Sequence, residues 1–129
     1  MSSFRFSISG AAILLVALSS GGAAAQGSPQ AGKSPVAPTP ESIAAGKQTY
    51  LRRCASCHAA SGEGGPGNDL IPAAPSLVDE QVKVKTDSQV FNNIKNGIGP
   101  DFNMVAFKDT LKDDEIWNVV NYLRSIAKK

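Results

Sequence analysis

The 129-residue chain has only two cysteines and one histidine, and this scarcity limits the metal sites that it could build. A structural zinc ion needs four cysteine or histidine ligands, so three such residues cannot complete a site. A thioredoxin-like dithiol is expected near alternating strands and helices, and no such alternation follows the two cysteines. Structural zinc binding and dithiol redox chemistry are therefore both disfavoured.

Long apolar runs and blocks of one charge are also missing. The apolar run over residues 8–18 is shorter than the roughly 20 residues that a membrane-spanning helix needs. Lysine and arginine total 13 against 11 acidic residues, and no cluster of basic residues occurs. We therefore expect no nucleic acid partner and no stable membrane insertion of the mature chain.

The N-terminal 25 residues have the layout of a secretory signal peptide. Arg5 precedes the apolar run, and small residues lead to a cleavage site after Ala25. We expect an exported protein, periplasmic if the chain is bacterial, although retention of the leader as an anchor is the alternative. About 104 residues then remain, enough for one small domain, which we place at 40–129. Residues 26–39 are rich in Pro, Gly, Ser and Ala and predict a flexible linker.

Helix signals begin directly after this linker. Thr39 before Pro40 is typical of an N-cap followed by the first helical residue, so a first helix should run up to the cysteines. Gly46 weakens that helix by roughly 1 kcal/mol relative to alanine, unless another helix crosses there. The candidate partner is residues 111–127, which have one apolar stripe and place Tyr122 near Gly46.

Two further start signals complete the helix prediction. Thr110 with Asp113 resembles a capping box for the last helix, and Thr86 with Gln89 resembles one for a helix over 86–96 that Gly97 ends. Residues 59–85 contain many glycines and prolines and only a weak strand-like alternation at 82–85. We interpret this stretch as a loop around a cofactor, because an irregular segment of that length is otherwise unusual in a small domain.

The cofactor is indicated by Cys54-Ala55-Ser56-Cys57-His58. Two cysteines separated by two residues and followed by histidine form the attachment signature of a c-type haem, in which both sulfurs form thioethers and the histidine binds iron. All cysteine and histidine in the chain lies in this pentapeptide. We therefore predict one haem c, attached through Cys54 and Cys57.

The chain resembles the class I cytochromes c over about residues 40–127. The matching features are Gly46 and Tyr50, the CxxCH motif, Pro75-Ser76-Leu77, Met104 with Phe107, and the end segment 116–123. The resemblance implies an all-α cytochrome c fold. In that fold three to four helices wrap around one covalently attached haem, and the N- and C-terminal helices cross.

The same resemblance implies the roles of four residues. Apart from Met1 in the leader, Met104 is the only methionine, and it would bind iron opposite His58. The carbonyl of Pro75 would accept the Nδ1 hydrogen of His58, with Pro66 and Pro72 as alternatives, and Leu77 would pack on the ring. Val105 departs from the family, which commonly has proline after the ligand methionine, so one backbone constraint is missing.

With both axial positions filled by protein, no position is open for a substrate. We therefore predict an electron-transfer protein without a catalytic site of its own, monomeric, that shuttles electrons between redox proteins such as a dehydrogenase, a membrane complex or a terminal oxidase. The haem edge near Cys57 would be its docking face. One alternative is a fixed cytochrome subunit of a dehydrogenase or oxidase complex. A haem-based ligand sensor or peroxidase is the other, and it is disfavoured because no second histidine exists.

Overall fold

The computed structural model describes residues 32–65, 73–100 and 104–127, which form five helices and, in these ranges, no strand. The predicted leader at 1–25, the first part of the linker, Pro66 and Pro72 lie outside the described residues. The helices are α1 (Pro40–Arg53), α2 (Ala55–His58), α3 (Glu80–Lys83), α4 (Asp87–Asn96) and α5 (Asp113–Ile126). None of the helices in the described ranges is long and apolar enough to cross a membrane. The predicted all-α fold is confirmed.

The predicted start of the first helix is confirmed. The Thr39 side chain accepts a hydrogen bond of 3.2 Å from the backbone N–H of Ser42, and Pro40 is the first helical residue. At the other end, the N–H of Cys54 donates to the Tyr50 carbonyl at 2.8 Å. Helix α1 therefore ends directly at the first cysteine, and the motif continues in the short helix α2.

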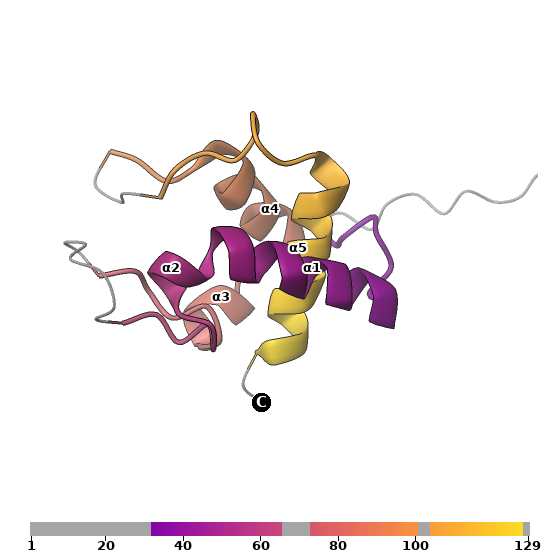
Figure 1. Cartoon of the computed structure of the whole chain (residues 1–129), viewed down its shortest axis with the longest axis horizontal. Coiled ribbons are helices and arrows are strands. Elements are labelled where there is room, and N and C mark those ends of the chain that lie inside the picture. Colours follow the sequence, from indigo (N-terminus) through magenta and orange to yellow (C-terminus); the bar gives the residue numbers. More distant parts are fainter. Residues whose placement is uncertain (1–31, 66–72, 101–103, 128–129) are drawn as a thin grey trace, which may run out of the picture.

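The two long helices, α1 and α5, cross at Gly46 (Figure 1). A Cβ atom on residue 46 would lie 1.9 Å from the carbonyl oxygen of Asn118 and 3.0 Å from Cβ of Tyr122. The predicted crossing beside Tyr122 is confirmed. The group nearest to Gly46 is the backbone of Asn118, one turn before Tyr122 in α5. Close approach explains why a helix-weakening residue occupies this position.

Helix α5 begins two residues later than predicted, at Asp113, and the Thr110–Asp113 capping box is wrong. The Thr110 hydroxyl instead donates to the Phe107 carbonyl, 3.3 Å away within a turn. The Glu115 carboxylate accepts the N–H of Lys112 at 2.9 Å and so caps the helix from its own first turn. Because the N-cap position is Lys112, Thr110 lies in the turn before the helix and not at its start.

Helix α4 begins as predicted. Thr86 and Gln89 form a reciprocal capping box, with bonds of 2.8 and 3.2 Å, and Gly97 follows the last helical residue with a φ of 72°. Within the predicted loop 59–85 the structure contains α3, at the place of the weak strand-like alternation. A single turn of four residues is too short for a helical apolar period to be visible in the sequence.

The core lies between α1, α4 and α5. Its most deeply buried side chains are those of Tyr50, Ile116, Val119 and Val120. Trp117 stacks on Phe91 with ring centroids 4.1 Å apart, so it joins α5 to α4. Packing is therefore the role of Trp117 that the structure describes.

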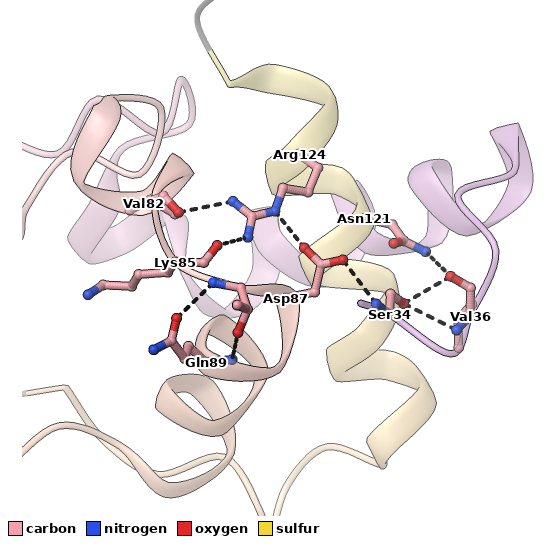
Figure 2. A network of polar contacts seen from close by, with 9 residues as sticks. Ser34, Val36, Val82, Lys85, Asp87, Gln89, Asn121 and Arg124 are labelled. Carbon is pink, nitrogen blue, oxygen red and sulfur yellow. Dashed lines mark hydrogen bonds and ion pairs between the residues drawn. The ribbon is translucent and has the colours of Figure 1, made fainter. Parts of the chain in front are cut away.

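The segment before α1 is bound to the domain (Figure 2). The N–H of Ser34 donates to Oδ2 of Asp87 at 2.9 Å, and the Asn121 side chain donates to the carbonyl of Val36 at 3.0 Å. Residues 32–36 therefore differ from the flexible linker that their composition predicted, whereas 26–31 lie outside the described residues. Side chains of α4 and α5 satisfy backbone groups of the segment, and such bonds need no apolar residues in it.

The turn after α2 is fixed by a buried tyrosine of α1. The hydroxyl of Tyr50 donates to the carbonyl of Ala59 at 2.7 Å, and its ring packs 5.3 Å from the ring of Tyr122. Ala59 has a positive φ of 61°, which is uncommon for a residue other than glycine. Helix α1 therefore positions the CxxCH motif from both sides.

Replacing Gly46 by alanine should destabilise the protein, although alanine is the better helix former. The added Cβ meets the Asn118 carbonyl and forces the helices apart, at a cost of about 2 kcal/mol. Guanidinium unfolding of the holoprotein measures the change. Lys47→Ala, at an exposed neighbouring position, should change stability by less than about 0.5 kcal/mol. A gain of about 1 kcal/mol in Gly46→Ala, the isolated-helix result, contradicts the close crossing.

Removing the Tyr50 hydroxyl should cost about 1–2 kcal/mol, because Tyr50→Phe leaves the Ala59 carbonyl without its donor. Tyr122→Phe is the matched control, since this ring belongs to the same pair and its hydroxyl makes no hydrogen bond within the described part of the chain. Thermal unfolding of both variants compares them. Equal losses in the two variants would mean that the hydrogen bond to Ala59 makes no specific contribution to stability.

Candidate functional site

One crevice brings together the six residues that the sequence predicts to hold the haem. It is lined by Cys54, Cys57, His58, Pro75, Leu77 and Met104. These residues come from the junction of α1 and α2, the loop before α3, and the loop between α4 and α5. Segments 46 positions apart in the sequence, at His58 and Met104, thus contribute to a single site.

The two thiols and the imidazole share one side of a helical turn. The N–H groups of Cys57 and His58 both donate to the Cys54 carbonyl, at 3.1 and 2.9 Å. Positions i, i+3 and i+4 of such a turn face the same way. Burial, with a smaller contribution from Cys57, raises the pKa of the Cys54 thiol to about 11, so this thiol is neutral at ordinary pH.

His58 is held in one tautomer by a backbone carbonyl. Its Nδ1 lies 3.1 Å from the oxygen of Pro75, which can only accept, so the ring hydrogen is on Nδ1 and the lone pair is on Nε2. Only 8% of the residue is exposed, and burial lowers the histidine pKa while the Pro75 bond partly opposes this shift. A buried neutral imidazole with a free Nε2 suits metal ligation.

The Pro75 carbonyl reaches His58 because two loops are joined by backbone hydrogen bonds. The N–H of Gly64 donates to the His58 carbonyl at 2.9 Å, and the N–H of Leu77 donates to the Gly62 carbonyl at 2.7 Å. The alternatives Pro66 and Pro72 lie outside the described residues. Of the described prolines, Pro75 is the one whose carbonyl is bonded to the imidazole.

Met104 and residues after it are bonded to the end of α4 or to the residues that follow it. Backbone hydrogen bonds link Ile98 to Met104 at 3.0 Å, Phe107 to Ile94 at 3.1 Å, and Lys108 to Lys95 at 3.0 Å. A Cβ on Gly97 would lie 2.6 Å from the Met104 oxygen, so only glycine lets the loop approach this closely. These contacts restrain the backbone where Val105 replaces the usual proline.

The rest of the crevice was not recognised from the sequence. Its back wall includes Val90 and Ile94 of α4 and Val119 and Leu123 of α5, two pairs at i, i+4 spacing. That spacing indicated buried positions without distinguishing a packed core from a cofactor wall. The polar residues Arg53, Lys85 and Asn93 also line the crevice, and no sequence signal separated them from other surface residues.

The crevice fits a haem group attached through cysteine. Its donors are two thiols, one neutral imidazole and one thioether, and most of its other lining residues are apolar. Haem iron in cytochromes c is held by histidine and methionine, and the two cysteines of a CxxCH motif attach the ring. The donor chemistry therefore agrees with the predicted cofactor.

Solved structures with this fold are c-type cytochromes. Cytochrome CL from Methylophaga aminisulfidivorans MPT is 27% identical with a TM-score of 0.55, and the match covers 67% of this chain and 56% of that one. The KustC0563 c-type cytochrome is 27% identical with a TM-score of 0.53, covering 64% and 98%. Cytochrome c6 from the diatom Phaeodactylum tricornutum is 28% identical with a TM-score of 0.51, covering 66% and 93%. The chain thus spans little more than half the length of that cytochrome CL.

A family model identifies the chain more directly. A comparison with curated protein sequences gives no significant match. The model described as cytochrome c oxidase, cbb3-type, subunit III matches residues 41–123, the region from α1 to near the end of α5. The chain belongs to this family of c-type cytochromes, and it has one haem c attached through Cys54 and Cys57.

Proposed function

We propose that the protein is a one-electron carrier whose single haem c is ligated by His58 and Met104. The observation that supports this most strongly is the crevice itself, because it places a neutral imidazole and the methionine loop around the site next to both attachment cysteines. When bound, haem c supplies reversible one-electron chemistry. The domain that performs this role extends over 40–129, after a leader and a short N-terminal segment.

Each residue of the site has a separate role in this proposal. His58 would hold the iron through Nε2, and the Pro75 carbonyl accepts the Nδ1 hydrogen, which fixes the ring and raises its basicity. Met104 provides the second ligand, and a thioether favours the reduced state of iron. Leu77 packs against the ring and keeps water from that side of the crevice.

A carrier is favoured over an enzyme because the chain supplies both axial ligands. A substrate needs an open position, and ligation by Met104, whose loop is bonded to the end of α4, would leave none. Peroxidase activity would also need a second acid–base group beside the iron, and His58 is the only histidine. The remaining polar residues along the crevice are Arg53, Lys85 and Asn93.

We infer export to the periplasm from the leader sequence, where the partner of a free carrier would be a dehydrogenase, a membrane complex or a terminal oxidase. A second candidate function is that of a fixed subunit in such an assembly. It is favoured by the family description, which names an oxidase subunit, and by a 25% identical structure that is titled as a reducing HAO-like protein complex. Purification from native membranes distinguishes the two, since only a fixed subunit co-purifies in a constant ratio.

Replacing Met104 by alanine should remove the sulfur-to-iron charge-transfer band of the ferric protein and open a coordination position. The reduction potential should fall by more than about 60 mV, a tenfold change for a one-electron couple, because the thioether no longer favours reduced iron. Visible spectra and redox titration measure both effects. Ferrous Met104→Ala should also bind carbon monoxide, which the native protein should not.

Lys108→Ala is the control for this variant, because this residue is exposed in the same loop and does not line the crevice. It should leave the band, the potential and the lack of carbon monoxide binding unchanged. An unaltered charge-transfer band in Met104→Ala would exclude methionine ligation.

The leader predicts the mass of the mature protein. Chain purified from its native host should begin at Gln26 and include the added mass of one haem, because cleavage follows Ala25 and attachment forms two thioethers. Intact-mass spectrometry under denaturing conditions measures both features. A chain that retains residues 1–25 would favour the membrane-anchored alternative.

A further inference from the structure

Two openings adjoin on the protein surface, and Lys85 lines both of them. The first is the haem crevice, whose charged lining residues within the described ranges are Arg53 and Lys85. The second is a shallow open hollow where the N-terminal segment meets α3, α4 and α5. It is lined by Gly32, Lys33, Lys83, Lys85, Thr86, Asp87 and Arg124. Every charged residue along the two openings is therefore a cation, except Asp87.

Asp87 does not offset the lysines, because both of its oxygens are already used (Figure 2). Oδ1 accepts from Nε of Arg124 at 2.7 Å, and Oδ2 accepts from the N–H of Ser34 at 2.9 Å. The other nitrogens of Arg124 donate to the carbonyls of Val82 and Lys85, at 3.0 and 2.5 Å. The arginine and the aspartate cancel as a pair, which leaves the lysines as the net charge of the hollow.

These lysines are available to a partner. Lys33 and Lys85 are exposed, and neither forms an ion pair within the described residues. Figure 2 shows the Lys85 side chain extending away from the Arg124 network, to which only its carbonyl is bonded. Lys83 is 30% exposed and lies 3.0 Å from Glu80, which partly offsets its charge; because Glu80 is 74% exposed and such surface pairs are weak, a partner's carboxylate can replace it.

We propose that Lys33, Lys83 and Lys85, the lysine hollow, dock an acidic face of the redox partner protein. The whole chain is nearly balanced, with 13 basic and 11 acidic residues, so the positive charge here is a local feature. Charge of one sign beside the redox site raises the rate of productive encounters with an oppositely charged partner. Protruding carboxylate side chains fit a concave hollow, whereas a flat lipid surface does not.

This inference rests on the proposed function and specifies the chemistry of the partner. Lys33 precedes residues 41–123, the region that the family model matches, so the docked N-terminal segment gives this chain a surface that the matched region does not include. Because Lys85 also borders the crevice, changing it would alter the haem environment as well as the docking surface. The test therefore changes only Lys33 and Lys83.

The experiment compares the holoprotein with its K33E/K83E variant on gold electrodes bearing a carboxylate-terminated monolayer as the acidic face. Voltammetry measures the electroactive coverage, and a quartz crystal microbalance measures the adsorbed mass on the same surface. At low ionic strength the electroactive coverage and the adsorbed mass of the variant should each be about tenfold lower than those of the native protein. On an ammonium-terminated monolayer the variant should adsorb more strongly than the native protein. Unchanged visible spectra and reduction potential verify that the haem site is intact.

The matched control is K47E/K112E, an equal charge change at exposed lysines that line neither opening. This control should keep most of the native coverage, and an equal loss would overturn the lysine hollow as a specific surface. A different outcome is that K33E/K83E binds phosphatidylglycerol vesicles less well than the native protein but adsorbs equally to the carboxylate monolayer. That result would indicate that the lysines bind a membrane surface, and it would overturn the proposal. If no electrode gives a reversible one-electron wave, the carrier function is contradicted. The adsorbed mass still measures docking in that case, so the two proposals are tested separately.

Discussion

A Cβ atom at position 46 would lie 1.9 Å from the Asn118 carbonyl oxygen, so α1 and α5 meet at this depth only because residue 46 is glycine. The position of the site follows from that contact. Helix α1 ends at the first cysteine, and α5 presents Val119 and Leu123 to the back of the crevice. A wider crossing would separate the attachment motif from the wall against which the cofactor packs.

The two proposed ligands, His58 and Met104, are positioned by different sets of hydrogen bonds. His58 is fixed by a side-chain bond to a carbonyl, and that carbonyl is positioned by backbone bonds between two loops. Met104 accepts one backbone bond from Ile98, and two more bonds, from Phe107 and Lys108, join the following residues to the end of α4, which packs on α5 through Phe91 and Trp117. Both sets of hydrogen bonds restrain backbone as well as side chains, so they favour one site geometry, as a carrier that must react quickly in both directions requires.

Local signals in the sequence were sufficient where the interaction is local. The Thr39 and Thr86 caps depend on residues three positions away, and both are confirmed. The Thr110 cap is wrong because the chain forms a turn at Thr110 and the helix begins only at Asp113. Ser34 bonds to Asp87 and Val36 bonds to Asn121, over 53 and 85 positions of the sequence, and no local sequence pattern predicts such contacts. Spacing likewise could not choose among three prolines, and the ligand roles of His58 and Met104 stay predictions that the crevice geometry supports.

Arg124 connects the features that the sequence could not relate. Its guanidinium binds the carbonyls of Val82 and Lys85, which line the crevice, and the carboxylate of Asp87, which in turn binds the N-terminal segment. Each bond to this charged group is stronger than a neutral one. One side chain therefore holds the crevice wall, the start of α4 and residue 34 in a fixed relation. The lysine hollow and the haem crevice adjoin because the same arginine organises the backbone of both.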